Sequence, residues 1–222
     1  MATVEMSNHK LAAYEELKKR ILNCEILPGE LINEKALMAE LNIGRTPIRE
    51  ALIALRTEKL VDATPRQGTY ASYITEKDVR EIYDLRKIIE IDIALNYQKT
   101  IDLASLLKLD KEMKSLCEST QYNAKDFYDL DIAFHKFILQ SSNNDWIIAT
   151  MDPFLEMTYR MGILNSLSHT ESRPEITYSQ HHQIIEGIMK ENSDIIRDSY
   201  ILHLNTGLVS ALTSLKRSSK DE

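Results

Sequence analysis

The sequence contains few of the residues that form disulfide cross-links or interrupt helices and strands. Its only cysteines, Cys24 and Cys117, lie far apart and outside any Cys-x-x-Cys spacing, so neither a disulfide framework nor a cysteine-bound zinc site is indicated. No apolar run approaches the roughly 20 residues that span a bilayer. Residues 1–10 lack the basic and apolar regions of a secretory signal. We therefore expect a cytoplasmic protein with no membrane partner.

The negative charge of the chain is confined to its second part. Residues 1–74 carry ten basic and ten acidic side chains, whereas residues 75–222 carry 17 basic and 24 acidic ones and account for the whole net charge of −7. A small module can present a basic face while its neighbour dominates the sum. The acidity of the chain therefore does not exclude a nucleic-acid partner.

Residues 1–74 are predicted to form three short helices and a hairpin. The first helix has apolar residues at helical spacing and ends before Pro28 and Gly29; these residues are Leu11, Tyr14, Leu17 and Ile21. A second helix is expected at about 34–41. A third begins at Arg45 after Gly44 as its N-cap. The β-compatible runs on either side of residues 65–68 predict a two-stranded wing.

From about Thr75 onward the pattern is helix after helix, without strand-like alternation. Helices are predicted at 76–98, 101–119, 125–142, 145–166, 175–191 and 193–216. Asn143 and Asn144, residues 166–174 and residues 190–194 are predicted as loops. The fold class is thus mostly α, with a winged helix-turn-helix in residues 1–74 and an all-helical bundle in residues 75–222.

The third helix carries an arginine stripe. Arg45, Arg49 and Arg56 fall along one face, and an opposite face is apolar, with Ile48, Ala51, Leu52 and Leu55. In a winged helix-turn-helix the N-terminal residues of this helix enter the major groove, where an arginine fork can bond guanine O6 and N7 or clamp a phosphate. Arg66 and Gln67 at the wing tip could reach the adjacent groove or backbone. The alternative is a solvated face whose arginines pair with Glu40, Glu50 or Glu58.

Residues 28–71 closely resemble the DNA-binding domain of the GntR superfamily of bacterial transcription regulators. The stretch has that family's Arg-Thr-Pro-x-Arg-Glu-Ala-Leu recognition helix and its Pro-x-x-Gly wing. The resemblance implies DNA contacts from Lys35, Arg45, Thr46, Arg49 and Gly68. The sequence departs from the family at Gly44, where serine is usual, and at Lys59, where glycine is usual. If position 59 needs a positive φ, Lys59 is mildly strained.

Four histidine and aspartate positions in the second domain share a pattern. Asp131 and His135 are four residues apart on one helix and can point at a single ion. His181 shares an apolar stripe with Ile184 and Ile188, whereas the neighbouring His182 is rotated by about 100°. His203 lies on the stripe of another helix, that of Ile196 and Ser199. The spacing alone leaves open that these are separately satisfied core or surface histidines. His9 and His169 are given no role.

This second domain resembles the FCD domain of FadR-type GntR regulators, an all-helical ligand-binding domain. A subset of that family has Asp-x-x-x-His, then a histidine followed by apolar residues three and seven positions later, then a further histidine 22 residues on. Asp131, His135, His181 and His203 fit that pattern, and His182 fits it less well. The resemblance implies a divalent transition metal, and three imidazoles with one carboxylate suit Zn²⁺ or Ni²⁺. Arg86 matches a family arginine that points into the ligand cavity, although an exposed ion pair with Asp84 or Glu90 is an equal alternative.

These resemblances imply a homodimeric transcription regulator, not an enzyme. It is expected to bind a pseudo-palindromic operator as a repressor and to sense a small organic acid at a metal-containing cavity. Two alternatives remain open: a metal that is structural or is itself the signal, and a metal-dependent enzyme, since Asp/His₃ sites also activate water or oxygen.

Overall fold

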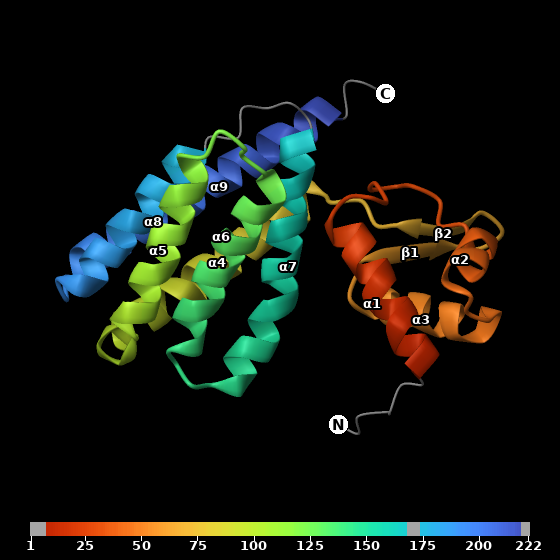
Figure 1. Cartoon of the computed structure of the whole chain (residues 1–222), viewed down its shortest axis with the longest axis horizontal. Helices are drawn as coiled ribbons and strands as arrows, with labels where there is room; N and C mark the ends of the chain where they lie inside the picture. The colour runs from red at the N-terminus through yellow and green to blue at the C-terminus, as the bar shows by residue number, and fades with distance from the viewer. Residues whose placement is uncertain (1–7, 168–173, 219–222) are drawn as a thin grey trace. The chain divides into compact units, whose positions relative to one another are not determined.

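The computed structural model describes residues 8–167 and 174–218. The chain divides into two units, Met1–Ile74 and Thr75–Glu222 (Figure 1). Among the described residues, no helix is both long and apolar enough to cross a membrane.

The first unit is a winged helix-turn-helix, as predicted. It comprises α1 (Asn8–Leu22), α2 (Glu34–Leu41), α3 (Arg45–Thr57), β1 (Val61–Thr64) and β2 (Gly68–Ala71). Both α1 and α2 pack against α3. The strands β1 and β2 are antiparallel, with Val61 opposite Ala71 and Thr64 opposite Gly68.

The tight turn between α2 and α3 follows from local chemistry. The Asn33 side chain caps α2 by accepting a hydrogen bond from the backbone of Ala36 at 3.1 Å, and Asn42 ends the helix with a left-handed φ of 53°. Asparagine tolerates that conformation better than most residues. Gly44 is the N-cap of α3, with no side-chain hydrogen bond. These caps fix the start of α3 at Arg45.

Three residues in and beside the wing have positive φ angles: Lys59, Arg66 and Gly68. Lys59 has a φ of 61°. A positive φ is the conformation in which mild strain is expected for a lysine at this position. Gly68 has a φ of 122°, and a Cβ at this position would lie 2.7 Å from the Leu31 side chain. Leu31 forms an isolated bridge to Tyr70 and so extends the hairpin at its β2 edge. The fold itself therefore requires glycine at position 68.

The second unit is all-helical over its described residues. Its helices are α4 (Glu76–Asn96), the short 3₁₀ helix η1 (Gln98–Thr100), α5 (Leu103–Cys117), α6 (Ala124–Gln140), α7 (Asp145–Leu167), α8 (Pro174–Met189) and α9 (Ser193–Ser218). Helix α9 packs against α4, α7 and α8, and α6 packs against α4, α5 and α7. The predicted fold class is confirmed. Most of the predicted loop at 166–174, with His169, lies outside the described residues.

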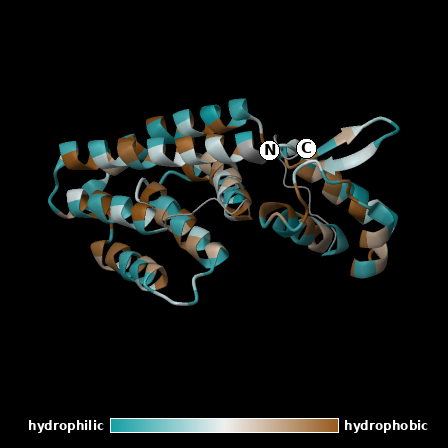
Figure 2. Ribbon diagram, turned by 90° about the horizontal axis from the view of Figure 1, so that it is seen from above, coloured by the Kyte–Doolittle hydropathy of each residue, from teal (hydrophilic) through white to brown (hydrophobic). Residues whose placement is uncertain are grey.

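The bundle interior contains an unusual number of buried polar side chains. Figure 2 shows hydrophilic and hydrophobic residues alternating along the helices, as expected when one face of each helix is buried. Among the apolar core, however, seven arginine, acidic or histidine side chains are also buried: Arg86, Glu90, Asp131, His135, Arg160, His181 and His203. Burying such groups is costly unless they are paired, so they mark the region where function is to be sought.

Candidate functional site

Three helices bring the four predicted metal ligands together. Helix α6 supplies Asp131 and His135, α8 supplies His181 and α9 supplies His203. One ligand atom from each residue lies within 4.8 Å of the others, and all four residues are buried. The arrangement is an Asp/His site that could bind a metal ion.

The histidine Nε2 atoms converge on one centre. His203 Nε2 lies 3.1 Å from His135 Nε2 and 3.2 Å from His181 Nε2. Asp131 Oδ1 lies 3.4 Å from His181 Nε2 and 4.0 Å from His135 Nε2. For comparison, ligand nitrogens about 2.0–2.1 Å from a tetrahedral ion are separated by about 3.3 Å. The atoms are therefore close enough to share one ion.

The histidine tautomers also fit a metal. His135 Nδ1 lies 2.6 Å from a carboxylate oxygen of Glu90, and His203 Nδ1 lies 3.4 Å from Gln180 Oε1. Both partners are oxygen acceptors, so each Nδ1 carries the proton and each Nε2 presents a lone pair. Two lone pairs that face each other at 3.1 Å repel unless a cation lies between them. This donor set therefore suits a metal better than a metal-free core.

Burial keeps the imidazoles of His181 and His203 in their metal-binding protonation state. It lowers the pKa of His181 and His203 well below 6.5. The other histidines of the cluster and Arg86 lower these pKa values further, because a second positive charge beside them is disfavoured. Burial also raises the pKa of Asp131, although the charges of His135 and Arg86 oppose the change. Neutral imidazoles are the form that binds metal ions.

Glu90 is a functional candidate that the sequence analysis weighed only as a surface partner of Arg86. It is fully buried; one of its oxygens accepts from Arg86 Nε at 2.6 Å and the other meets His135 Nδ1. Burial alone would raise the pKa of Glu90, but the charges and hydrogen bonds of Arg86 and His135 lower it to about 2. Tyr83, Arg86 and Glu90 are three and four residues apart along α4, so they share one helix face. This spacing could have indicated that Glu90 is buried with the other two.

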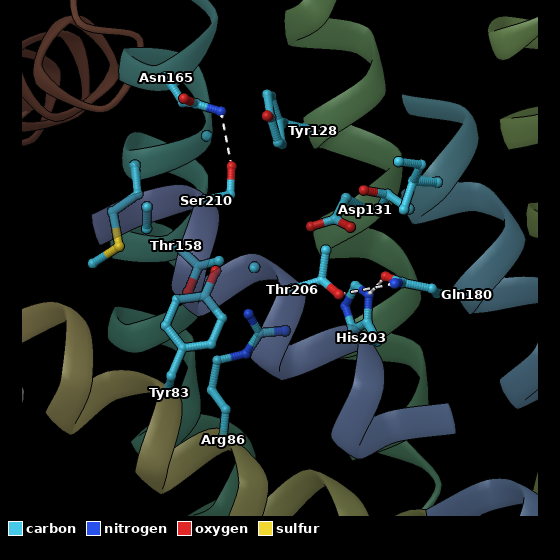
Figure 3. Close-up of a pocket in the computed structure, with 16 residues that line it drawn as sticks. Tyr83, Arg86, Tyr128, Asp131, Thr158, Asn165, Gln180, His203, Thr206 and Ser210 are labelled. Carbon is cyan, nitrogen blue, oxygen red and sulfur yellow. Dashed lines mark hydrogen bonds between the residues drawn. The ribbon is translucent and has the colours of Figure 1, made fainter. Parts of the chain in front are cut away.

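A cavity of about 220 Å³ adjoins the cluster. Asp131 and His203 line it together with Arg86, so two candidate metal ligands and a cation face the same cavity (Figure 3). Arg86 is 1% exposed, which rules out the exposed ion pair considered from the sequence, although its pairing with Glu90 is real. Its Nη2 is buried and has no hydrogen-bond partner among the described residues. A buried donor without a partner is costly, and an anionic ligand would satisfy it.

Two tyrosines can line the cavity because each packs against a glycine, where any larger side chain would collide with it. A Cβ on Gly207 would lie 2.7 Å from the Tyr83 hydroxyl, and a Cβ on Gly162 would lie 2.4 Å from the Tyr128 ring. Burial raises the pKa of Tyr83 to about 12, so its hydroxyl stays protonated at neutral pH. The remaining polar lining consists of hydroxyl and amide groups, from Thr158, Asn165, Thr177, Gln180, Thr206 and Ser210.

The neighbouring histidine of α8 lies outside the cluster. His182 is half-buried, and its Nδ1 lies 3.1 Å from both carboxylate oxygens of Asp110 on α5. The apolar stripe of α8 thus places His181, and not His182, with the other ligands.

All predicted DNA-contact residues of the first unit are exposed: Lys35, Arg45, Thr46, Arg49, Arg66, Gln67 and Gly68. Arg49 Nε donates to Glu34 at 3.1 Å, and its side chain remains 59% exposed. The acidic partners considered from the sequence are partly engaged elsewhere, since Glu40 pairs with Arg20 and Glu58 with Lys18. The arginine face is therefore available to a ligand.

A shallow groove lies between α3 and the wing. Arg49 and Arg56 line the part nearer α3, and Arg56 and Arg66 line the part nearer the wing tip. Arg56 was recognised as part of the arginine stripe but not as a DNA contact. Its position in both parts of the groove adds it to the candidate interface.

The first unit is a winged helix-turn-helix with an exposed arginine face. The second is a helical bundle that encloses an Asp/His₃ cluster and a cavity. This combination defines a class of transcription regulators. Residues 10–71 match the bacterial regulatory proteins of the gntR family. Residues 81–206, more than half of the chain, match the FCD domain. The protein belongs to the GntR family of transcriptional regulators with an FCD domain, which is not an enzyme class.

Two similar regulators have names that state a role. The HTH-type transcriptional repressor RspR of Escherichia coli is 27% identical over 86% of this chain and 83% of its own length. The gluconate operon transcriptional repressor of Bacillus licheniformis is 29% identical over 86% of this chain and 79% of its own.

Solved structures share the fold. E. coli McbR/YncC superposes with a TM-score of 0.76 at 18% identity, covering 95% of this chain and all of that one. The Zn²⁺-bound FCD domain of TM0439 superposes with a TM-score of 0.52 at 21% identity, covering 65% of this chain and 98% of that one.

Proposed function

We propose that this regulator senses a small organic acid at a metal-containing cavity in its second unit and binds operator DNA through its first. The observation that carries the proposal is that two candidate metal ligands and Arg86 line the same cavity. Asp131 and His203 belong to the four-residue cluster, and Arg86 lines the same cavity with a buried Nη2 that has no hydrogen-bond partner in the described part of the chain. A carboxylate that enters the cavity meets the Arg86 guanidinium and the bound metal ion. The site has a low dielectric, in which charge-assisted contacts are strong.

The metal is a divalent transition ion held by Asp131, His135, His181 and His203, with Zn²⁺ or Ni²⁺ favoured by the three imidazoles and one carboxylate. The Zn²⁺-bound FCD domain of TM0439, which shares the fold, supports zinc. When bound, the ion supplies positive charge and, where its coordination is incomplete, a position for an effector oxygen.

The effector is a small carboxylic acid that carries hydroxyl groups. Arg86 binds its carboxylate, and the hydroxyl and amide side chains of the remaining lining match alcohol groups that both donate and accept. Similarity to a gluconate operon repressor supports a hydroxylated acid.

Operator binding uses Lys35, Arg45, Thr46, Arg49, Arg66, Gln67 and Gly68 in a homodimer that reads a pseudo-palindrome. Repression is supported by two similar regulators named as repressors. Pairing two modules on one duplex raises affinity through effective concentration.

The deciding experiment measures operator affinity of metal-free and metal-loaded protein with and without hydroxylated acids, gluconate first. We expect an acid to change operator affinity only when metal is present. A response that survives complete metal removal would contradict a metal-dependent effector site. If metal alone changes operator affinity and no acid alters it further, the metal is the signal. If metal changes only thermal stability, it is structural.

A further inference from the structure

One buried carboxylate bridges the cation of the cavity and the metal cluster. Glu90 Oε1 accepts from Arg86 Nε at 2.6 Å, and Glu90 Oε2 lies 2.6 Å from His135 Nδ1. All three side chains are almost completely buried, so water does not compete for these contacts. The bridge joins α4 to α6 across the bundle.

The His135 end of the bridge decides which ring nitrogen is available. An ionised carboxylate only accepts hydrogen bonds, so the proton of neutral His135 lies on Nδ1. Nε2 then presents its lone pair, and it is this atom that lies 3.1 Å from His203 Nε2 at the centre of the cluster. A carboxylate behind a ligating imidazole also orients the ring and raises its basicity.

The Arg86 end of the bridge decides where the guanidinium points. Glu90 holds Nε, and Nη2, which has no hydrogen-bond partner among the described residues, is left for the cavity that Arg86 lines. Figure 3 shows the guanidinium between Tyr83 and His203. Because the guanidinium fork is rigid, fixing Nε fixes the direction of the other donors.

We propose that Glu90 is the positioning residue that presents His135 to the metal and Arg86 to the effector. This inference rests on the proposed metal and effector site and assigns its geometry to one side chain. A purely structural role predicts something different: Glu90 would then serve only to neutralise the buried Arg86, and any change that removes both charges would restore the site.

Zn²⁺ affinity, measured by competition with a chromophoric chelator, separates these roles. Glu90→Gln keeps the shape but removes the charge, and we expect a 10–100-fold loss of Zn²⁺ affinity, as is usual when a partner behind a metal ligand is lost. The double variant Arg86→Met/Glu90→Gln removes the buried pair altogether. The double variant should be more thermally stable than Glu90→Gln, because methionine in place of Arg86 removes the buried charge that Glu90→Gln leaves unpaired. It should nevertheless still bind Zn²⁺ weakly. Recovery of wild-type affinity in the double variant would overturn the inference.

Asp110→Asn is the matched control, because Asp110 meets His182 Nδ1 at 3.1 Å outside the cluster; it should keep wild-type Zn²⁺ affinity. The ¹⁵N shifts of the His135 ring in metal-free protein provide a second measurement. They should show the proton on Nδ1 in the wild type and a tautomer mixture in Glu90→Gln.

The outcomes distinguish the inference from the proposed function. A wild type that binds no Zn²⁺ overturns both the metal site and the role of Glu90. A wild type that binds Zn²⁺ tightly while Glu90→Gln binds it equally well overturns only the role of Glu90, as does an Nε2-protonated His135 in the metal-free wild type.

Discussion

His181 and His182 are adjacent in the sequence and lie in opposite environments. His181 is buried with its Nε2 at 3.2 Å from His203 Nε2, whereas the half-buried His182 faces Asp110 on α5. One step along a helix rotates a side chain by about 100°, which accounts for the separation. The pair offers a built-in control for the metal site.

We expect His135→Ala to lose bound metal and His182→Ala to retain it. A ligand that binds only the folded state stabilises it by RT ln(1 + [L]/Kd), about 4 kcal/mol at 1,000 times Kd. A chelator should therefore lower the melting temperature of the wild type and of His182→Ala, but not that of His135→Ala. Elemental analysis and thermal melts test this, and equal metal content in wild type and His135→Ala would refute the site.

Arg49→Ala should reduce discrimination between operator and scrambled DNA. A bidentate base contact contributes about 1–3 kcal/mol of discrimination. Arg49 is exposed near the N-terminus of α3, where it pairs with Glu34. The measurement is a titration on an operator selected from random DNA and on its scrambled form. An Arg49→Ala protein that discriminates as well as the wild type would show that another residue reads the bases.

Arg56→Ala should weaken binding to all sequences alike. Arg56 lies in the groove between α3 and the wing, where a phosphate contact is expected. Losing one such contact should reduce the slope of log affinity against log salt by about 1. Lys35→Ala should behave in the same way. A selective loss on operator DNA alone would instead assign Arg56 or Lys35 to base contacts.

Acidification should destabilise the metal-free protein below about pH 6.5. Burial, with help from nearby positive groups, lowers the pKa of His181 and His203 well below 6.5 in the folded state. The unfolded chain then binds more protons, so the free energy of unfolding is highest above that pH and falls as the pH drops through it. Burial raises the pKa of Asp131, so this group has the opposite effect. It stabilises the folded state below its ordinary pKa of 3.8, and that contribution is lost as the pH rises.

Urea unfolding of chelator-treated protein at several pH values measures this dependence. His181→Gln, which removes one of the two titrating imidazoles, should show a shallower loss, and His182→Ala should follow the wild type. A free energy of unfolding that does not change between about pH 8 and 5.5 would contradict the expectation.

The protein should sediment as a dimer of its 25.6 kDa chain without DNA. Helices α4 and α9 pack together and expose apolar side chains, with Ile88 70%, Leu202 51% and Val209 63% exposed. Covering such residues favours association. Leu202→Glu should therefore raise the dissociation constant, whereas Trp146→Glu on α7 should not. A wild type that sediments only as a monomer at micromolar concentration would count against the homodimer.

Much of the fold could be predicted from local pattern. The start of α3 at Arg45 follows from the Asn42 turn and the Gly44 cap, and its buried face follows from the spacing of Ile48, Ala51 and Leu55. The pairing of Asp131 with His135 is likewise local, because residues four apart share a helix face. Spacing alone predicted that His181 and His203 lie on the buried stripes of their helices. That they join Asp131 and His135 in one ligand set was implied by the resemblance to the FCD domain.

The remaining relationships depended on tertiary packing. Glu90 and His135 are 45 residues apart, and periodicity shows that each is buried without showing that they meet. The same holds for Gln180 and His203 on different helices, and for Arg56, whose groove exists only because the wing folds back beside α3. A sequence determines which face of each helix is buried, because that depends on spacing along one chain segment. Which side chains on two helices touch depends on how the helices are packed against each other, and only the three-dimensional structure fixes that.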